Sequence, residues 1–271
     1  MKVNDKYGLL KDYISSFHKV AVAFSGGVDS TFLLKAVVDA IGGRNVVAIT
    51  VVSPYIPSWE LEEAGEFTKG LDISHQLIKV PINQEICKNP ENRCYICKHF
   101  MFSMMKDLAI RLGYDTVMEG TNLDDLSDYR PGLVALTELG ILTPLLDLKI
   151  TKSEIREMSR ELCLHTWDKS PYACLLSRIP YGQEITLDDL KRVELAERFL
   201  IDRGFGWIRV RSHGDLARIE LKRDERYRLF NENLLDEIDL KLRELGFRYV
   251  TFDLQGYRRG SLNKDFKNDR K

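Results

Sequence analysis

A short apolar run that passes directly into a glycine turn constrains the fold of this chain more than any other feature. Residues 19–24 have the sequence KVAVAF, which is typical of a buried strand, and residues 25–27 are Ser-Gly-Gly. From Ser30 onward, apolar residues recur at helical spacing until the glycine pair at 42–43 ends the pattern. A strand, a glycine turn and a helix in immediate succession predict the first half of a parallel-sheet unit.

Strands and helices continue to alternate along the first 167 residues. Besides 19–24, we expect strands at 46–52, 75–80 and 116–119. We expect further helices at 59–69 and 97–112, and one that opens at a Thr-x-x-Glu capping box, 151–154, and runs to about 162. This order predicts an α/β fold, with a parallel sheet, right-handed crossovers and helices on both faces, as the domain formed by residues 1–167.

The order of elements changes after this domain. Residues 168–182 are polar with two prolines and predict a linker, which carries Cys174. The pattern then predicts a helix, two strands, a helix and a strand, at 187–203, 207–212, 216–221, 232–245 and 248–253. A smaller α+β domain over 183–260 follows from this order, with a polar tail at 261–271.

The glycine turn at 25–27 has the chemistry of an anion-binding loop. Glycines let the backbone approach a ligand closely, and the start of the following helix offers unpaired N–H groups and the positive end of its dipole. Ser25, Ser30 and Thr31 add hydroxyl groups. The loop is not a Walker A motif, because no Gly-Lys-Ser/Thr follows at the required spacing. The alternative is a turn in which Asp29 or Ser30 simply caps the helix.

A second polar loop follows the strand expected at 116–119, and its functional side chains are Glu119, Thr121, Asp124 and Asp125. Parallel sheets bind ligands at the carboxyl ends of their strands, so we expect this loop to face the same site as the glycine turn. Its acids are oxygen donors of the kind that hold Mg²⁺ beside nucleotide phosphates. The alternative is a polar loop that only caps local structure.

The five cysteines are an odd number, and a reducing compartment argues against a disulfide framework. Cys94 and Cys97 form a single CxxC at a helix start, where the dipole would favour thiolates, but a zinc site usually needs a second pair. With Cys174 they could hold a four-iron cluster that leaves one iron open. The alternative is two packed thiols. We expect Cys87 and Cys163 to be buried structural thiols.

Four sequence blocks together resemble the LarE family of sulfur transferases, a branch of the PP-loop superfamily. In chain order they are SGGVDS (25–30), EGTNLDDLSDYRPG (119–132), ACLLSRIPYG (173–182) and RVRSHGDLARIE (209–220). The resemblance runs over most of the chain, and the four blocks in this order are far more specific than any one of them. The resemblance implies the PP-loop ATP pyrophosphatase fold for the first domain.

The resemblance also implies a function, ATP-dependent sulfur transfer in nickel-pincer cofactor biosynthesis. Members of the family adenylate a carboxylate of a pyridinium dicarboxylate mononucleotide, release pyrophosphate and install sulfur as a thiocarboxylate. The implied cofactors are ATP, Mg²⁺ and a [4Fe–4S] cluster, with Asp29 helping to place Mg²⁺. The implied ATP-binding residues are Ser25, Gly26, Gly27, Asp29, Ser30, Thr121 and Asp125.

Cys174 is the implied catalytic cysteine. In the single-cysteine type of the family, the cysteine aligned with it gives up its own sulfur and becomes dehydroalanine. This chain departs from that type because it also carries Cys94 and Cys97. In three-cysteine members the ligands of a four-iron cluster would be these three residues, and the cluster would relay sulfide. Sacrificial and relayed sulfur transfer therefore both remain open.

Three arginines are candidates for binding the phosphate or carboxylate of the acceptor. Arg209 and Arg211 alternate on the strand expected at 207–212, so their side chains share one face. Guanidinium groups bind phosphate and carboxylate with two parallel hydrogen bonds. We expect these two residues and Arg178 to bind the acceptor, whereas His213 is close only in sequence. The alternative for each is a solvated strand face.

Two other functions remain open. A PP-loop tRNA thiolase would need an RNA-binding surface, and the first 202 residues carry 23 Lys and Arg against 29 Asp and Glu. Residues 203–271 carry 17 against 12, which is too dilute to indicate a nucleic-acid binder. A non-catalytic nucleotide-binding module would need neither the thiols nor the arginine pair nor the second polar loop.

Composition limits the cellular setting. Apolar residues make up 44% of the chain and charged residues 30%, as in globular proteins. No apolar run reaches the roughly 18 residues of a membrane span, and the N-terminus lacks the features of a signal peptide. We therefore expect a cytoplasmic protein that binds no membrane and no nucleic acid. Its expected partners are a small-molecule nucleotide, sulfide or another sulfur donor, and further copies of itself.

Overall fold

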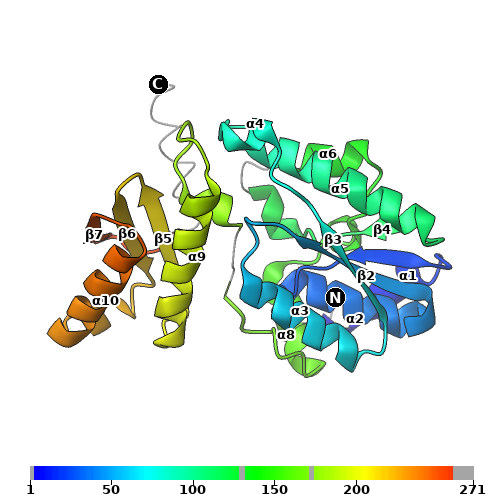
Figure 1. The fold of residues 1–271 in the computed structure, drawn as a ribbon. Helices are drawn as coiled ribbons and strands as arrows, with labels where there is room; N and C mark the ends of the chain where they lie inside the picture. The colour runs from blue at the N-terminus through cyan, green and yellow to red at the C-terminus, as the bar shows by residue number, and fades with distance from the viewer. Residues whose placement is uncertain (1–2, 128–131, 171–173, 259–271) are drawn as a thin grey trace. The chain divides into compact units, whose positions relative to one another are not determined.

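The chain folds into two compact units (Figure 1). The structure, a computed structural model, describes residues 3–127, 132–170 and 174–258. The first unit takes its described residues from 3–81 and 92–170, and the second from 82–91 and 174–258. The predicted tail at 261–271 and residues 171–173 of the predicted linker lie outside the described residues.

The first unit alternates helices and strands, as predicted. Its strands are β1 (Val20–Ala23), β2 (Val46–Val52), β3 (Ser74–Lys79) and β4 (Thr116–Met118). Its helices are α1 (Val3–Ile14), α2 (Val28–Ile41), α3 (Ser58–Gly70), α5 (Arg93–Arg111), α6 (Gly132–Glu138), α7 (Pro144–Asp147) and α8 (Lys152–Glu161), with 3₁₀ turns η1 (Gly43–Asn45) and η2 (Leu123–Ser127). Each strand lies within one residue of its predicted bounds at either end.

The four strands are parallel and lie in the order β3-β2-β1-β4. Val20 of β1 pairs with Val46 on one side and with Thr116 on the other. The chain therefore moves outward from β1 to β3 and then crosses back to place β4 on the other side of β1. In sheets of this kind, ligands bind at the carboxyl ends of the strands where the order reverses. The loops after β1 and β4 occupy that edge.

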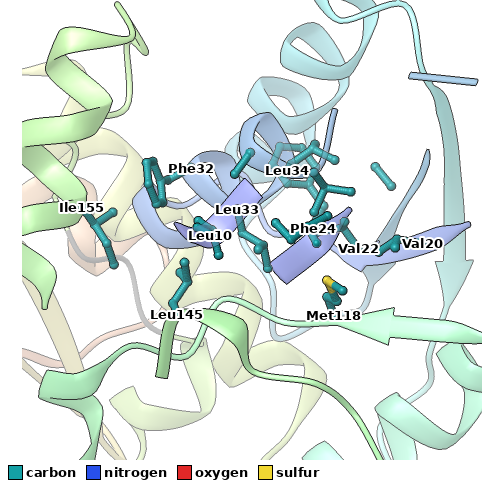
Figure 2. Close-up of a cluster of buried hydrophobic side chains, with 14 of the residues drawn as sticks. Leu10, Val20, Val22, Phe24, Phe32, Leu33, Leu34, Met118, Leu145 and Ile155 are labelled. Carbon is teal, nitrogen blue, oxygen red and sulfur yellow. The ribbon is translucent and has the colours of Figure 1, made fainter. Parts of the chain in front are cut away.

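Helices cover both faces of the sheet, which confirms the predicted α/β class. Alternate residues of β1 face opposite ways: Val20 and Val22 pack with α1, α2 and α8, whereas Ala21 packs with α5 and α6. Figure 2 shows the first of these clusters, with Phe32 from α2 and Ile155 from α8. Each large apolar side chain buried in this way contributes about 1.5–3 kcal/mol. The two clusters hold the sheet and the loops at its edge in place.

Local signals set several element boundaries. α8 begins at the predicted capping box, in which the Thr151 hydroxyl accepts from the Glu154 N–H and the Glu154 carboxylate accepts from the Thr151 N–H at 2.8 Å. α2 ends at Gly42, whose φ of +78° suits glycine. The sequence analysis does not predict α1, α6 or α7, which lack such paired start and stop signals.

The second unit is a small α+β assembly, as the element order predicts. Its helices are α4 (Gln84–Cys87), α9 (Leu187–Asp202) and α10 (Glu232–Glu244), with 3₁₀ turns η3 (Leu175–Arg178) and η4 (Arg226–Leu229). Its strands are β5 (Ile208–His213), β6 (Leu216–Leu221) and β7 (Tyr249–Phe252). β5 and β6 form an antiparallel hairpin, and β7 pairs in parallel with β6.

Residues 82–91 belong to the second unit although they interrupt the first in sequence. Asn89 is fully buried, and its side-chain amide donates to the carbonyls of Pro180 at 2.6 Å and Gln183 at 3.0 Å. The Ile185 N–H donates to the Cys87 carbonyl at 2.8 Å. The predicted division of the chain at 168–182 does not place residues 82–91 in the second unit. The contacts that hold them there join residues about 90 positions apart in the sequence.

Among the described residues, no helix combines the length and the apolar character that a membrane span requires. α5, with 19 residues, carries charged side chains along its length and packs on the sheet.

Candidate active site

The loop after β1 is shaped as a tight turn. The Phe24 N–H donates to the Ile49 carbonyl at 2.9 Å and the Thr50 hydroxyl donates to the Phe24 carbonyl at 2.8 Å, which holds the end of β1. Gly26 then adopts a φ of +70°, and a Cβ atom there would lie 3.3 Å from the Cβ of Ala64 in α3. Both conditions favour glycine at this position.

α2 starts directly after this turn and leaves its first N–H groups to the loop. Gly27 is the N-cap, and no side chain caps the helix there. The Thr31 N–H donates to the Gly27 carbonyl at 2.9 Å, so the N–H groups before it have no acceptor within the helix. The Ser30 hydroxyl donates to the Gly27 carbonyl at 3.2 Å and lies 3.1 Å from the Ser25 hydroxyl. Ser30 thus braces the loop, and the helix start is available to an anion.

The loop after β4 lies directly against the start of α2. A Cβ atom on Gly120 would lie 3.0 Å from the carbonyl carbon of Asp29 and from the amide nitrogen of Ser30. The Asn122 side chain also donates to the Asp29 carboxylate at 3.2 Å. Glycine at position 120 therefore allows the two loops to touch, as the predicted sheet requires.

Thr121 and its neighbours form a local hydrogen-bond network in this loop. Both the N–H and the hydroxyl of Thr121 donate to the Glu119 carboxylate, the N–H at 2.7 Å. The Lys98 ammonium lies 3.3 Å from the same carboxylate. Asp125 accepts the Asn122 N–H at 3.2 Å. The predicted contacts of Thr121 and Asp125 with ATP stay predictions, since here both side chains serve the loop.

Two lysines from distant parts of the sequence reach the glycine turn. The Lys152 ammonium lies 2.6 Å from the Asp29 carboxylate. The Lys169 ammonium donates to the Gly26 carbonyl at 3.0 Å and forms an ion pair with Glu63 of α3. The sequence analysis finds neither lysine, because no motif links them to the turn. Each of them places an ammonium group beside the turn.

The carboxylates near the loop are oxygen donors of the type that Mg²⁺ prefers. Burial raises the pKa of the Asp29 carboxyl above its ordinary value, and Asp125 acts in the same direction, whereas the Lys152 ammonium lowers that pKa. Asp124 accepts the backbone N–H of Lys152 at 2.6 Å. Within the parts of the chain that the structure describes, no three His, Cys, Asp or Glu side chains gather as a metal site. The predicted iron–sulfur ligand set therefore gains no support from this geometry.

The CxxC occupies the first turn of α5, which begins at Arg93 rather than at the predicted residue 97. Cys94 is exposed and Cys97 is partly buried. Burial raises the pKa of the Cys97 thiol, and this outweighs the opposing effects of a hydrogen bond with Tyr55 and of the nearby Lys98. Burial at Cys97 therefore acts against the thiolate that the helix start is expected to favour.

The remaining thiols of the chain are less buried than predicted. Cys163 is exposed, directly after α8, and has a φ of +56°. Cys87 is only partly buried. The prediction of buried structural thiols is wrong, because Cys163 lies in the turn that ends a helix rather than on an apolar face.

Cys174 lies in the second unit, at the N-cap of η3, and is partly buried. Its carbonyl accepts from the Ser177 hydroxyl at 2.8 Å and from the Arg178 guanidinium at 3.3 Å. Arg211 donates to the Ser177 carbonyl. The predicted catalytic cysteine is therefore within one short turn of two of the predicted acceptor-binding arginines.

These arginines are buried and paired. Arg178 is fully buried and donates twice to Glu197 of α9, both times at 2.8 Å. Arg211 donates twice to Glu220 of β6, at 3.1 and 3.0 Å. Burial lowers the pKa of Arg209 to about 10. The alternative of a solvated strand face is wrong, because Arg209 and Arg211 are only 4% and 6% exposed.

Among the described residues of this cluster, the buried arginines outnumber the buried glutamates. Three arginines, Arg178, Arg209 and Arg211, share two glutamates, Glu197 and Glu220. The net charge of these side chains is positive, which suits an anionic group next to Cys174. The roles of these arginines in binding an acceptor stay predictions.

Comparison with known proteins decides the family. A family model described as NAD synthase matches residues 2–98. The uncharacterized protein slr1717 of Synechocystis is 43% identical over 257 residues, which cover 94% of this chain and 96% of that protein. Pyridinium-3,5-bisthiocarboxylic acid mononucleotide synthase of Lactiplantibacillus plantarum is 35% identical over 254 residues, 92% of this chain and 91% of that enzyme. The chain belongs to the LarE family.

As a LarE-family protein, the chain is an enzyme of the sulfur-transferase class with a PP-loop fold. A more limited similarity links it to the tRNA 2-thiolation protein NcsA of Haloferax volcanii, at 30% identity over 118 residues, 38% of this chain and 36% of that protein. The Lactiplantibacillus enzyme, which matches over most of its length, and NcsA, which matches over part of its length, are thus both named for the insertion of sulfur.

Proposed function

We propose that this LarE-family enzyme uses ATP to activate a carboxylate of a pyridinium dicarboxylate mononucleotide and then replaces an oxygen of that carboxylate by sulfur. The reaction would serve biosynthesis of a nickel-pincer cofactor. The observation that carries the proposal is the full-length similarity to a bisthiocarboxylic acid mononucleotide synthase. The anion-binding turn at the edge of a parallel sheet supports the ATP-dependent half of the reaction.

In the first step, a carboxylate oxygen of the acceptor attacks the α-phosphorus of ATP, and pyrophosphate leaves. The N–H groups at the start of α2 and the turn at Gly26 and Gly27 would bind the pyrophosphate as negative charge accumulates on it. Lys152 and Lys169 add positive charge next to them. Mg²⁺, when bound with ATP, neutralises phosphate charge, and Asp29 and Asp125 would hold it.

In the second step, sulfur attacks the acyl carbon of the adenylate, a carbon–sulfur bond forms and AMP leaves. The sulfur would be that of Cys174 or sulfide delivered beside it. In the sacrificial version, β-elimination then breaks the Cβ–S bond of Cys174 and leaves dehydroalanine. In the relayed version, Cys94, Cys97 and Cys174 would be the ligands of a four-iron cluster, which would relay sulfide that a separate donor supplies.

Acceptor binding would use the arginine cluster of the second unit. Arg211 reaches from β5 to the Ser177 carbonyl of η3, Arg209 shares its face of the strand, and Arg178 belongs to η3 itself. A phosphate or carboxylate of the mononucleotide would add the negative charge that the cluster lacks. Arg178 donates to Glu197, to the Cys174 carbonyl and to the Ser177 hydroxyl, so we assign it the role of supporting the other two arginines.

Intact mass after turnover tests the two versions of sulfur transfer. The enzyme is purified without oxygen, assayed for iron and sulfide, and incubated with ATP, Mg²⁺ and the dicarboxylate mononucleotide, with and without added sulfide. A mass loss of roughly 34 Da, one H₂S, with Cys94→Ser and Cys97→Ser still active, supports the sacrificial version. If Cys94→Ser, Cys97→Ser and Cys174→Ser each lose the bound iron, and the mass of the unchanged protein stays constant over repeated turnovers, the cluster is supported. Cys163→Ser, an exposed thiol outside the site, is the control.

A tRNA-thiolating function is the second candidate, favoured by the partial similarity to NcsA. RNA that copurifies with the enzyme, together with pyrophosphate release that depends on tRNA rather than on the mononucleotide, would replace our proposal by this one. ATP binding without pyrophosphate release in the presence of either acceptor would contradict both.

A further inference from the structure

Two buried threonines and a histidine form a chain of hydrogen bonds within the first unit. The His75 ring of β3 lies between the two hydroxyl groups, with Nε2 2.8 Å from that of Thr50 and Nδ1 2.9 Å from that of Thr68. Thr50 lies in β2 and Thr68 in α3, and they are only 2% and 1% exposed. Buried polar groups need partners, so the direction of each bond in this chain can be worked out.

One end of the chain of bonds holds the end of β1. The Thr50 hydroxyl donates to the Phe24 carbonyl at 2.8 Å, and Phe24 directly precedes the glycine turn. A hydroxyl group has one proton, so while that proton is on the carbonyl the Thr50 oxygen can only accept from the ring. The bond between Thr50 and His75 therefore requires a proton on Nε2.

The other end reaches the helix on which the glycine turn packs. The Thr68 hydroxyl lies 3.1 Å from the carbonyls of Ala64 and Gly65, one turn earlier in α3. In an α-helix those carbonyls also accept from the N–H groups four residues later, so they keep a donor if the hydroxyl turns away. Thr68 is therefore able to donate to Nδ1 of His75. Ala64 is the residue that a Cβ atom on Gly26 would approach to 3.3 Å.

The neutral His75 ring suits both threonines in only one tautomer. Burial lowers the pKa of His75, so the ring is neutral near pH 7 and carries one N–H. With the proton on Nε2, the ring donates to Thr50 and accepts from Thr68. With the proton on Nδ1, Thr50 would have to turn its own proton to the ring, and the Phe24 carbonyl would lose this donor. Only the Nε2–H tautomer therefore keeps the bond at the end of β1.

We propose that His75 is a positioning residue for the nucleotide site, whose Nε2–H orients the Thr50 hydroxyl onto the Phe24 carbonyl and so fixes the end of β1. This role rests on the proposed function, since it takes the ligand of the glycine turn to be ATP. A turn that presents backbone N–H groups to pyrophosphate depends on the direction in which the chain leaves the strand. Loss of the bond should therefore weaken ATP binding, although His75 acts through Thr50 and not on the phosphates themselves.

NMR of the imidazole nitrogens tests the tautomer without any nucleotide. The full chain is labelled with ¹⁵N-histidine, and the signals of His75 are those that disappear in His75→Gln. At about pH 8, well above the ordinary pKa of histidine, we expect a slowly exchanging proton on Nε2 and none on Nδ1. Thr50→Val should speed the exchange of that proton, and the exposed ring of His165 should exchange rapidly in every sample. A proton on Nδ1 of His75 overturns the role and leaves the proposed function standing.

Calorimetry with ATP and Mg²⁺, without acceptor, tests the effect on the nucleotide site. The amide nitrogen of glutamine can take the place of Nε2, whereas asparagine is shorter and reaches only the place of Nδ1. His75→Asn should raise the Kd for ATP by about two- to tenfold, the effect of one hydrogen bond, and His75→Gln should restore most of the affinity. His165→Asn is the matched control, because His165 is exposed and packs on Phe67, which also contacts Phe24. Its Kd should be that of the unchanged protein.

A double-mutant cycle distinguishes positioning through Thr50 from a general disturbance of the sheet. Thr50→Val removes the hydroxyl that His75 orients and should raise the Kd by about the same factor as His75→Asn, whereas Thr50→Ser keeps the hydroxyl and the affinity. Because both residues act through one bond to the Phe24 carbonyl, the double variant should bind ATP about as well as either single variant. If His75→Asn does not fold, the comparison of Thr50→Val with Thr50→Ser takes its place.

The outcomes separate this role from the proposed function. No ATP binding by the unchanged protein overturns both. If the unchanged protein binds ATP, an unchanged Kd in folded His75→Asn, equal losses in His75→Asn and His75→Gln, or additive losses in the double variant overturn the role of His75 alone. Equal affinities of Thr50→Val and Thr50→Ser also overturn it. An Nε2–H tautomer, together with non-additive losses in His75→Asn and Thr50→Val that the conservative variants reverse, supports it.

Discussion

The two units of this enzyme present their candidate anion sites in opposite ways. In the first unit the site is mostly backbone, made by a turn at Gly26 and by the start of α2. In the second unit it is made of side chains, with Arg209 and Arg211 almost completely buried. One site depends on the path of the chain, and the other depends on buried charge.

The difference has an energetic reason. Free N–H groups at a helix start can be hydrated, so a backbone site costs little when no ligand is bound. Buried guanidinium groups must be neutralised before a ligand arrives, because an unpaired buried charge costs several kcal/mol. Glu197 meets this requirement for Arg178, and Glu220 meets it for Arg211. The first site should therefore be sensitive to changes of shape and the second to changes of charge.

The largest effect should come from Glu197→Ala in the second unit. The change leaves Arg178 buried without its carboxylate, and breaking a buried pair in this way costs about 3–5 kcal/mol. Urea unfolding measures the loss. The control is Glu237→Ala, since Glu237 pairs with Arg203 but is 56% exposed, and such pairs contribute about 1 kcal/mol or less. Equal losses for the two variants would contradict the distinction between the sites.

The next effect should come from Gly26→Val in the first unit. Valine is strained at a φ of +70° by about 1–2 kcal/mol and would crowd Ala64, so the turn should open. We expect the dissociation constant for ATP to rise by roughly tenfold or more in calorimetry.

Gly42→Val is the control for that experiment. Gly42 has a φ of +78°, and a Cβ atom at this position would meet no neighbouring atom within 4 Å, so valine there carries the same backbone strain away from the site. Its stability should fall while its ATP affinity stays unchanged. An unchanged ATP affinity in folded Gly26→Val would remove the turn from the nucleotide site.

Acid should weaken the second unit through Glu197. Its pairing with Arg178 holds the pKa of the Glu197 carboxyl below its ordinary value, despite desolvation by burial. The stability that this shift confers is fully present above the ordinary pKa of about 4.3 and is lost as the pH falls through the lower folded pKa. Urea unfolding followed at several pH values measures the slope. Glu197→Gln should flatten it, and a slope identical to that of the unchanged protein would contradict the assignment.

The smallest effect should come from Ser30→Ala. The Ser30 hydroxyl donates to the Gly27 carbonyl at 3.2 Å and accepts from the Ser25 N–H at 3.3 Å, and such a hydrogen bond contributes about 0.5–1.5 kcal/mol. The dissociation constant for ATP should rise by about two- to tenfold. Ser16→Ala, whose hydroxyl bonds to the Tyr13 carbonyl in an exposed turn, is the control. A loss larger than that of Gly26→Val would mean that side chains rather than backbone carry the first site.

The strands and the principal helices of the fold could be predicted because their signals are local. Apolar runs bounded by glycine or proline marked β1, β2 and β3, and the capping box at Thr151 marked the start of α8. The helix α1 was missed because it has no comparable start and stop signals. Residues 82–91 were assigned to the wrong unit because the buried bonds of Asn89 reach residues about 90 positions away.

The candidate site was predictable to the extent that backbone conformation makes it. Gly26 lies in the predicted turn and has the positive φ that the turn needs, whereas the close approach at Gly120 is seen only in the structure. Lys152 and Lys169 could not be found, because a lysine on a solvated face and a lysine at an anion site have the same local sequence. The burial of Arg209 was equally invisible, since its neighbours on β5 alternate as on any half-buried strand.

Residues that are neighbours along the chain are enough to define the parallel sheet, the anion-binding turn after β1 and the family to which the chain belongs. Which charges meet follows from the packed structure alone. Packing brings Lys169 to the Gly26 carbonyl, although the two residues are 143 positions apart in the sequence, and it pairs Glu197 with Arg178. The physical reason is that charge pairing depends on distance in space and on burial, and neither is set until the helices have packed on the sheets.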